Sequence, residues 1–149
     1  MKKLITIIAV LALLTLGTGC GGGGTKKLVC TMKDDESTAT VTIDHKNNKA
    51  TKMTMAMEME VETELIDDYI SMMNMYLGAY DGIKGFKVDV SPNKAKTAII
   101  ITMSLDLTNI DKSRIDDLES IFGNVDFSDA DLDIKTIRRD LESEGFTCK

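Results

Sequence analysis

Four methionines with a two-residue spacing form the most distinctive pattern in the chain. Met53, Met55, Met57 and Met59 alternate with other residues in an M-x-M-x-M-x-M run. Thioether sulfur is a soft ligand that suits Cu(I), so this spacing is compatible with a copper carrier. A β-strand whose inward face is filled with adaptable methionine side chains has the same spacing. Because no His or Cys lies within the run, we expect a core-facing strand and no metal site.

Acidic residues with the spacing of a calcium loop occur near the C-terminus. Asp129, Asp131 and Asp133 match the first three ligand positions of such a loop. The loop also needs Gly at position six and Glu at position twelve, where this chain has Ile134 and Asp140. Acids that complement the dipole at the start of a helix explain the run better. No carboxylate stands out among the 24 acids, so we expect no catalytic residue and no cofactor.

All three tyrosines of the chain, Tyr69, Tyr76 and Tyr80, lie in one predicted helix. At the helical angle per residue they fall within about 40° of one another. They are candidates for lining a ligand-binding cleft between this helix and the sheet. The favoured interpretation places them in the core with their hydroxyl groups at its edge, because large rings are usually buried.

Residues 1–19 have the parts of an export signal. Two lysines follow Met1, an apolar run extends over Leu4–Leu16, and small residues precede Cys20. The apolar run is shorter than the roughly 20 residues that a membrane-spanning helix needs. We expect residues 1–19 to be removed and Cys20 to carry a lipid as the mature N-terminus. Cleavage by an ordinary signal peptidase is the alternative and would give a secreted protein.

Residues 20–27 are expected to tether the folded domain, residues 28–149, to the membrane. The Gly21–Gly24 run is typical of a coil-like spacer, and Lys26 and Lys27 suit an anionic bilayer surface. This order of anchor, tether and domain places the protein on the outer face of the cytoplasmic membrane.

Two further cysteines, Cys30 and Cys148, lie at opposite ends of the predicted domain. Outside the cytoplasm two thiols can persist as a disulfide. This pairing would close nearly the whole domain into one loop. Chain-entropy estimates for a loop of that size give a stabilisation of the folded state of about 4 to 5 kcal/mol. Two buried free thiols are the alternative, and we expect the disulfide.

Composition excludes several classes of function. The chain has 149 residues, which is the length of one domain. It has 18 Lys and Arg against 24 Asp and Glu, a formal net charge of −6, whereas a nucleic-acid binder needs clustered positive charge. Aromatic residues make up 5% of the chain, Trp is absent and there is one His. These counts leave little material for base stacking, for histidine-based metal sites or for a Ser-His-Asp mechanism.

Hydrophobic periodicity predicts alternating strands followed by helices. The predicted strands are Lys27–Met32, Thr38–His45, Thr51–Thr63, Phe86–Val90 and Thr97–Leu107. The predicted helices are Glu64–Tyr80, Asp111–Phe122 and Ser128–Glu144. The order β-β-β-α-β-β-α-α predicts an α+β fold in which helices cover one face of an antiparallel sheet.

The hairpin between the second and third strands has a predictable register. Facing residues share a face of the sheet, so Ile43 is expected opposite an odd-numbered residue such as Met53. This register predicts a three-residue loop. A slip of one residue would bury the glutamates that alternate with the methionines.

Several segments resemble the YehR-like small bacterial lipoproteins, a family whose function is not established. The likeness is carried by Gly19-Cys20, Leu28–Thr31, the alternating strand Lys52–Val61 and the ending Glu144–Lys149. The resemblance covers most of the chain and implies an α+β domain on the outer face of a cell membrane. It supplies no catalytic residues.

We therefore expect a membrane-anchored, non-catalytic module that binds a protein or small-molecule ligand outside the cytoplasm and does not bind nucleic acid. The sequence shows no pattern of a paired nucleophile and base and no cluster of metal-ligating residues, which favours this hypothesis. The alternative is a small metal carrier or enzyme that uses clustered acids or methionines.

Overall fold

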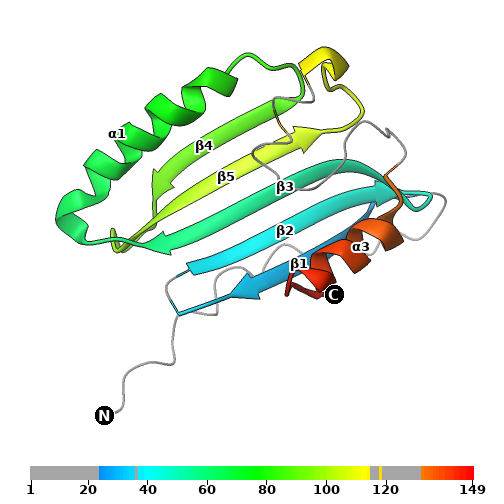
Figure 1. The fold of residues 1–149 in the computed structure, drawn as a ribbon, viewed down its shortest axis with the longest axis horizontal. Helices are drawn as coiled ribbons and strands as arrows, with labels where there is room; N and C mark the ends of the chain where they lie inside the picture. Colours follow the sequence, from blue (N-terminus) through cyan, green and yellow to red (C-terminus); the bar gives the residue numbers. More distant parts are fainter. Residues whose placement is uncertain (1–23, 36, 115–117, 119–131) are drawn as a thin grey trace, which may run out of the picture.

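The computed structural model describes residues 24–35, 37–114, 118 and 132–149. The chain forms a six-stranded antiparallel sheet, and Figure 1 shows helices alongside it. The strands are β1 (Lys26–Lys33), β2 (Ser37–Lys46), β3 (Lys49–Glu60), β4 (Phe86–Pro92), β5 (Ala98–Asp106) and β6 (Thr147–Cys148). The helical elements are α1 (Ile66–Leu77), α3 (Ile134–Ser143) and the 3-10 segments η1 (Thr63–Leu65), η2 (Gly78–Tyr80) and η3 (Lys112–Arg114). No helix among the described residues is long and apolar enough to cross a membrane.

The sheet has the strand order β4-β5-β3-β2-β1-β6, and each neighbouring pair is antiparallel. Alternating sequences give it one apolar face and one polar face, because successive side chains point to opposite sides of a strand. Ile43 and Leu105 from the sheet, Leu77 from α1, and Ile134 and Ile137 from α3 belong to one buried core. Both helices therefore cover the same face, and the predicted α+β fold is confirmed.

The first five strands and α1 lie where the sequence pattern predicts them. β1 begins at Lys26, so two lysines assigned to the tether belong to the sheet. Lys26 pairs with His45, and Lys27 pairs with Asp44. The Lys27 Nζ also lies 3.8 Å from the Asp44 Oδ1.

The β2–β3 hairpin has the predicted pairing of Ile43 with Met53, but its loop is shorter than predicted. Lys46 pairs with Lys49, which leaves only Asn47 and Asn48 in the turn. Both asparagines have positive φ angles, 52° and 65°, a backbone conformation that suits a tight two-residue hairpin turn.

A bulge next to Asp44 and His45 reconciles this short turn with the register. Asp44 pairs with Lys52 and His45 pairs with Ala50, so Thr51 is the additional residue on β3. The Thr51 hydroxyl donates a hydrogen bond to the Asp44 carbonyl at 3.0 Å. The prediction of a three-residue loop was wrong because it assumed continuous pairing, and a bulge changes the residue count on one strand.

The C-terminal helix begins later than predicted, at Ile134. Residues 128–131 lie outside the described part of the chain, but Leu132 and Asp133 are described and are not helical. The Leu132 carbonyl accepts a hydrogen bond from the Ala50 N–H, and the Ile134 N–H donates one to the Asn48 carbonyl. The segment is extended because it pairs with the β2–β3 hairpin, a long-range partner that helical periodicity does not reveal.

Asp133 caps α3. Its Oδ1 accepts hydrogen bonds from the backbone N–H groups of Lys135 at 2.8 Å and Thr136 at 3.4 Å. Such a cap satisfies donors that the first helical turn leaves without partners. Of the predicted helix Asp111–Phe122, the structure describes η3 and Leu118, which is helical and fully buried. Residues 115–117 and 119–122 lie outside the described residues.

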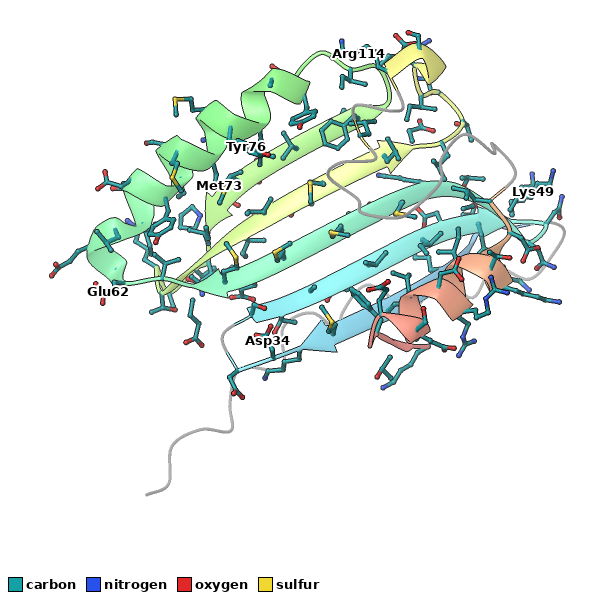
Figure 2. All side chains as sticks on the ribbon, viewed as in Figure 1. Asp34, Lys49, Glu62, Met73, Tyr76 and Arg114 are labelled. Carbon is teal, nitrogen blue, oxygen red and sulfur yellow. A yellow bond between two sulfur atoms is a disulfide. The ribbon has the colours of Figure 1, made fainter. Side chains whose placement is uncertain are left out.

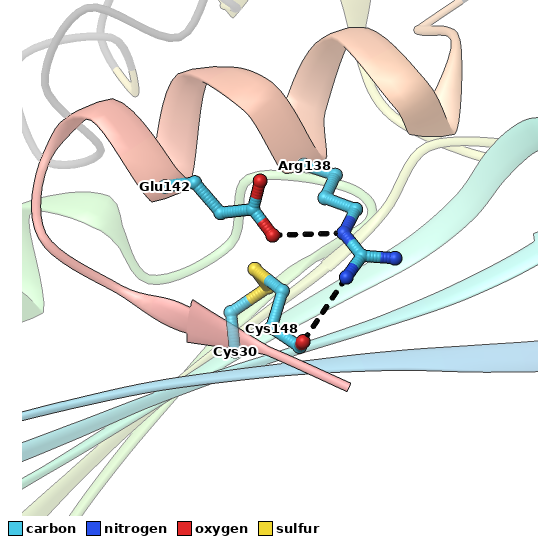
Figure 3. The surroundings of a disulfide bond; sticks show 4 residues. All are labelled: Cys30, Arg138, Glu142 and Cys148. Atoms are coloured by element: carbon cyan, nitrogen blue, oxygen red, sulfur yellow. Dashed lines mark hydrogen bonds and ion pairs between the residues drawn. A yellow bond between two sulfur atoms is a disulfide. The ribbon is translucent and has the colours of Figure 1, made fainter.

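Cys30 and Cys148 form the predicted disulfide. It joins β1 to β6, a two-residue strand that the periodicity did not predict. Val29 and Lys149 exchange two backbone hydrogen bonds beside it, at 3.1 and 2.8 Å. In Figure 3, the guanidinium of Arg138 on α3 donates to the Cys148 carbonyl at 3.2 Å and to Glu142 at 2.9 Å. The disulfide and this arginine together hold the C-terminus against the sheet.

The disulfide should contribute measurably to stability. We expect the Cys30→Ala/Cys148→Ala variant to lose about 2 to 5 kcal/mol of unfolding free energy, because the bond closes a loop of 118 residues in the unfolded chain. Urea denaturation followed by circular dichroism measures this loss. Reductant should destabilise the wild type and leave the double variant unchanged. An equal reductant effect on both proteins would contradict the prediction.

Candidate functional site

Large apolar side chains are exposed along one side of α1. The exposed fraction is 80% for Met75, 68% for Tyr76 and 47% for Met72. Leu65 and Tyr69 are also exposed. We call these five residues the α1 stripe. Among the described residues only Val29 is a further exposed large apolar side chain, so exposure of this kind is concentrated on α1 and on Leu65, the residue directly before it.

The stripe lies beside the face of α1 that contacts the sheet. Buried or half-buried residues recur at Ile66, Ile70, Met73 and Leu77, with helical spacing. Leu65, Tyr69, Met72 and Tyr76 repeat the same spacing one residue earlier, which is about 100° around the helix. The apolar surface of α1 is therefore about twice as wide as the surface that the sheet covers.

The position of α1 explains this excess. Figure 1 shows α1 running alongside β4, which is an edge strand of the sheet. A helix above the middle of a sheet has apolar neighbours on both sides, whereas a helix at the margin has them on one side only. The outer half of the apolar surface of α1 therefore remains exposed.

The three predicted tyrosines do not share one environment. Tyr80 is half-buried and packs against the core, and its ring meets that of Phe86 edge to face at 6.4 Å. Tyr69 and Tyr76 are exposed, so placing them in the core was wrong. Figure 2 labels Tyr76 together with Met73, the half-buried methionine of the same helix.

An open hollow of about 790 Å³ adjoins the N-terminal end of the stripe. It lies where the β1–β2 turn, the end of β3 and the start of α1 meet. The lining residues are Asp34, Asp35, Ser37, Met59, Glu60, Val61, Glu62, Leu65 and Tyr69. We call this feature the acidic hollow, because four of its lining residues are acids and none is basic. Leu65 and Tyr69 belong to both the hollow and the stripe.

Local hydrogen bonds hold the walls of the hollow in place. Asp34 closes the β1–β2 turn by accepting hydrogen bonds from the Ser37 N–H at 2.6 Å and the Ser37 hydroxyl at 2.8 Å. The chain leaving β3 is tied to the β4–β5 turn, since Val61 N–H donates to the Thr97 carbonyl and the Thr63 hydroxyl donates to the Lys96 carbonyl, both at 3.1 Å. The segments that line the hollow are therefore supported by the sheet.

The β3 methionines lie on the core face of the sheet. Met53 is buried, and Met55 and Met59 are half-buried and pack against the core. Met55 faces Met103 across the β3–β5 pair. The alternation in the sequence thus reflects a core-facing strand, as predicted. No group of three or more His, Cys, Asp or Glu side chains could hold a metal in the part of the chain that the structure describes.

Several acids outside the hollow make local capping hydrogen bonds. Asp111 accepts from the Ser113 hydroxyl at 2.7 Å and from its backbone N–H at 3.0 Å. These two hydrogen bonds lower the pKa of the Asp111 carboxyl below its usual value. Of the acids with calcium-loop spacing, which we expected at the start of a helix, Asp129 and Asp131 lie outside the described residues, and Asp133 is the cap of α3.

The face of the sheet away from the helices carries hydroxyl groups. Thr42 faces Thr54 across β2 and β3, and Thr54 faces Ser104 across β3 and β5. These side chains are half-buried by their neighbours in the sheet. The face is mainly polar, with Ala56 and Ile100 among its polar residues, and a mainly polar face is typical of the solvated side of an antiparallel sheet.

The sequence identified only part of this candidate site. It singled out Tyr69 and Tyr76, which lie on the stripe, but not Leu65, Met72 or the acids of the hollow. The signal in the sequence was the width of the apolar arc on α1, which a single buried face does not require. Cys20 lies outside the described residues.

Comparison with known proteins identifies the fold. No family model and no curated protein matches this chain. The NMR structure of the YehR protein of Escherichia coli has a similar fold, with a TM-score of 0.68, 16% sequence identity, and coverage of 86% of this chain and 93% of that one. The NMR structure of a Streptococcus pneumoniae TIGR4 protein has a TM-score of 0.58, 21% identity, and coverage of 100% and 98%. The chain therefore has a YehR-like fold.

The two sides of α1 should respond differently to truncation. We expect Leu77→Ala to cost about 2 to 4 kcal/mol of unfolding free energy, because Leu77 is in the core. Tyr76→Ser, one residue away, should change stability by less than about 0.5 kcal/mol, because the side chain is exposed. Urea titrations of both variants measure the difference. A large loss of stability in Tyr76→Ser would show that the stripe is covered within the molecule.

Proposed function

We propose that this protein is a lipid-anchored, YehR-like lipoprotein on the outer face of the cytoplasmic membrane that binds a partner through the α1 stripe without catalysing a reaction. The observation that carries the proposal is the concentration of exposed large apolar side chains on one helix. Contiguous apolar surface of this kind marks interaction sites in soluble domains.

The disulfide supports a location outside the cytoplasm. Structural disulfides persist in oxidising compartments and are rare where thiols are kept reduced. The pair Cys30–Cys148 is buried and bonded. Together with the export-signal pattern of residues 1–19, it favours an exported lipoprotein.

The direction of β1 supports a defined orientation of the domain on the membrane. β1 begins six residues after Cys20, a reach of at most about 20 Å. The start of β1 pairs with the end of β2 at the β2–β3 hairpin, whereas Asp34 and the acidic hollow follow the other end of β1. Figure 2 shows Lys49 of the hairpin and Glu62 of the hollow at opposite ends of the sheet. The tether thus leaves the domain at the end remote from the hollow.

Charged side chains occupy both ends of this axis. The hairpin end carries Lys26, Lys27, Lys46 and Lys49, which suit an anionic bilayer, beside Asp44. The remote end carries the acids of the hollow, together with Lys33 at the end of β1 and Lys96 in the β4–β5 turn. A domain anchored through Cys20 would therefore present the hollow and the adjoining part of the stripe away from the lipid surface.

Lipidation is tested by labelling growing cells with an alkyne fatty acid. We expect the wild-type protein to incorporate the label and to fractionate with membranes, and Cys20→Ser to do neither. Cys30→Ser/Cys148→Ser is the matched control, because it removes both disulfide-bonded cysteines of the folded domain and leaves the proposed anchor intact. An unlabelled wild-type protein would show that the mature protein is not lipidated at Cys20.

The binding role is tested by photo-crosslinking in intact cells. We expect a photoreactive amino acid at position 75 to give a discrete adduct with another molecule, because Met75 is the most exposed residue of the stripe. The same amino acid at position 42, on the polar face of the sheet, is the control and should give none. Absence of an adduct at positions 72, 75 and 76 would remove the stripe as a contact surface.

A further inference from the structure

We infer that the α1 stripe and the acidic hollow together bind a cationic amphipathic helix of a partner protein, antiparallel to α1 and with its basic residues at the hollow. This inference rests on the binding role proposed above and adds the chemistry of the partner.

The spacing of the stripe fits a helix. Leu65, Tyr69, Met72 and Tyr76 are separated by four, three and four residues, which is the alternation of a two-helix seam. The stripe extends for three helical turns, or about 17 Å. A partner helix of three to four turns would cover it, as in complexes where an amphipathic helix lays its apolar face on a hydrophobic surface.

The charge around the stripe selects a basic partner. Between Met53 and Ile83 the sequence has seven acids and no Lys or Arg. The acids on or before α1 include Glu62, Asp67 and Asp68. If a second copy of this chain bound through the same surface, its acids would face these acids and repel them. An anionic membrane would be repelled by the same acids. A helix rich in Lys or Arg is complementary.

The hollow provides a place for a long basic side chain. Met59, Val61, Leu65 and Tyr69 form apolar lining, and carboxylates stand beside them. Lys and Arg side chains lay their methylene groups along such surfaces while the charged end stays among polar groups. Within the described part of the chain, the Asp35, Glu60 and Glu62 carboxylates make no hydrogen bond or ion pair, so they retain their capacity to accept hydrogen bonds.

The position of the hollow sets the direction of the partner. It adjoins the N-terminal end of α1, so an antiparallel helix would place its C-terminal turn there. Basic residues are favourable in the last turn of a helix, because they complement the negative end of its dipole. Basic residues at the C-terminal end of the partner would therefore suit both their own helix and the carboxylates of the hollow.

The chain contains a natural reporter for this surface. It has no Trp, and its three tyrosines are Tyr69, Tyr76 and Tyr80, two of them on the stripe. Tyrosine emission therefore originates entirely from α1 and η2. A probe peptide without aromatic residues should change that emission when it binds at the stripe.

The experiment titrates the whole protein with dye-labelled helical peptides of 14 residues, built from Leu, Ala and Gln with four Lys in the last turn. The anisotropy of the dye gives the Kd. The tyrosine emission of the protein, measured with the unlabelled peptide, shows whether the peptide binds at the stripe. We expect micromolar binding that weakens at least tenfold between 50 and 500 mM salt. A peptide with four Glu in place of Lys should bind at least tenfold more weakly. One with the four Lys in the first turn should bind about two- to fivefold more weakly, because it loses the favourable dipole interaction.

Paired variants separate the two parts of the surface. Glu60→Gln/Glu62→Gln should weaken binding of the Lys peptide at least tenfold, and Met72→Ser/Tyr76→Ser should do the same. Asp89→Asn/Glu144→Gln makes the same change in net charge elsewhere on the molecule and should leave the Kd within twofold. Circular dichroism verifies that each variant is folded.

Four results would overturn the inference. Equal affinity for the Lys and Glu peptides would exclude charge selection, and equal weakening by the control pair would exclude a local site. Displacement of the Lys peptide by spermine at equal concentration would reduce the interaction to charge alone. If crosslinking at position 75 yields an adduct while no peptide binds, the binding role holds and the basic-helix partner is wrong. If neither is observed, both proposals fail.

Discussion

The pairing of β3 with both β2 and β5 is the constraint on which the rest of the structure depends. β3 has twelve residues and is paired along nearly all of them on both sides. Because side chains alternate between the faces, a slip of one residue would exchange Met53 for its polar neighbours and bring Glu58 into the core. The cost of burying carboxylates makes one register strongly preferred. That register then sets which side chains of β2 and β5 face the helices.

The two edges of the sheet are covered in different ways. At one margin, β6 is only two residues long and is held to β1 by the disulfide and by α3 through Arg138. At the other margin, β4 is covered by α1, but nothing in the described part of the chain covers the outer side of α1 itself. The exposed stripe is thus a consequence of placing a broadly apolar helix at the edge of a sheet. A purely structural helix at this position would need only one apolar face.

The acidic hollow arises from the same geometry. β3 ends at Glu60, and the chain turns into η1 and α1 while the β1–β2 turn closes beside it. The alternation of apolar and acidic residues in β3 continues into the lining of the hollow, so Met59 contributes an apolar side chain while Glu60 and Glu62 contribute carboxylates. Apolar and acidic groups therefore lie side by side at the start of the stripe. This combination favours a ligand that is itself both apolar and basic.

The sequence by itself determined the first five strands, the α+β class, the Ile43–Met53 pairing and the cysteine pair, because each depends on local alternation or on residue type. Only the tertiary structure decided the Thr51 bulge, the extended segment before Ile134 and the strand β6, because each exists through a partner distant in the chain. The candidate site divides in the same way. The width of the apolar arc on α1 follows from the sequence alone. Which half of the arc is buried depends on where the sheet ends, and the periodicity of one helix contains no information on the position of that edge.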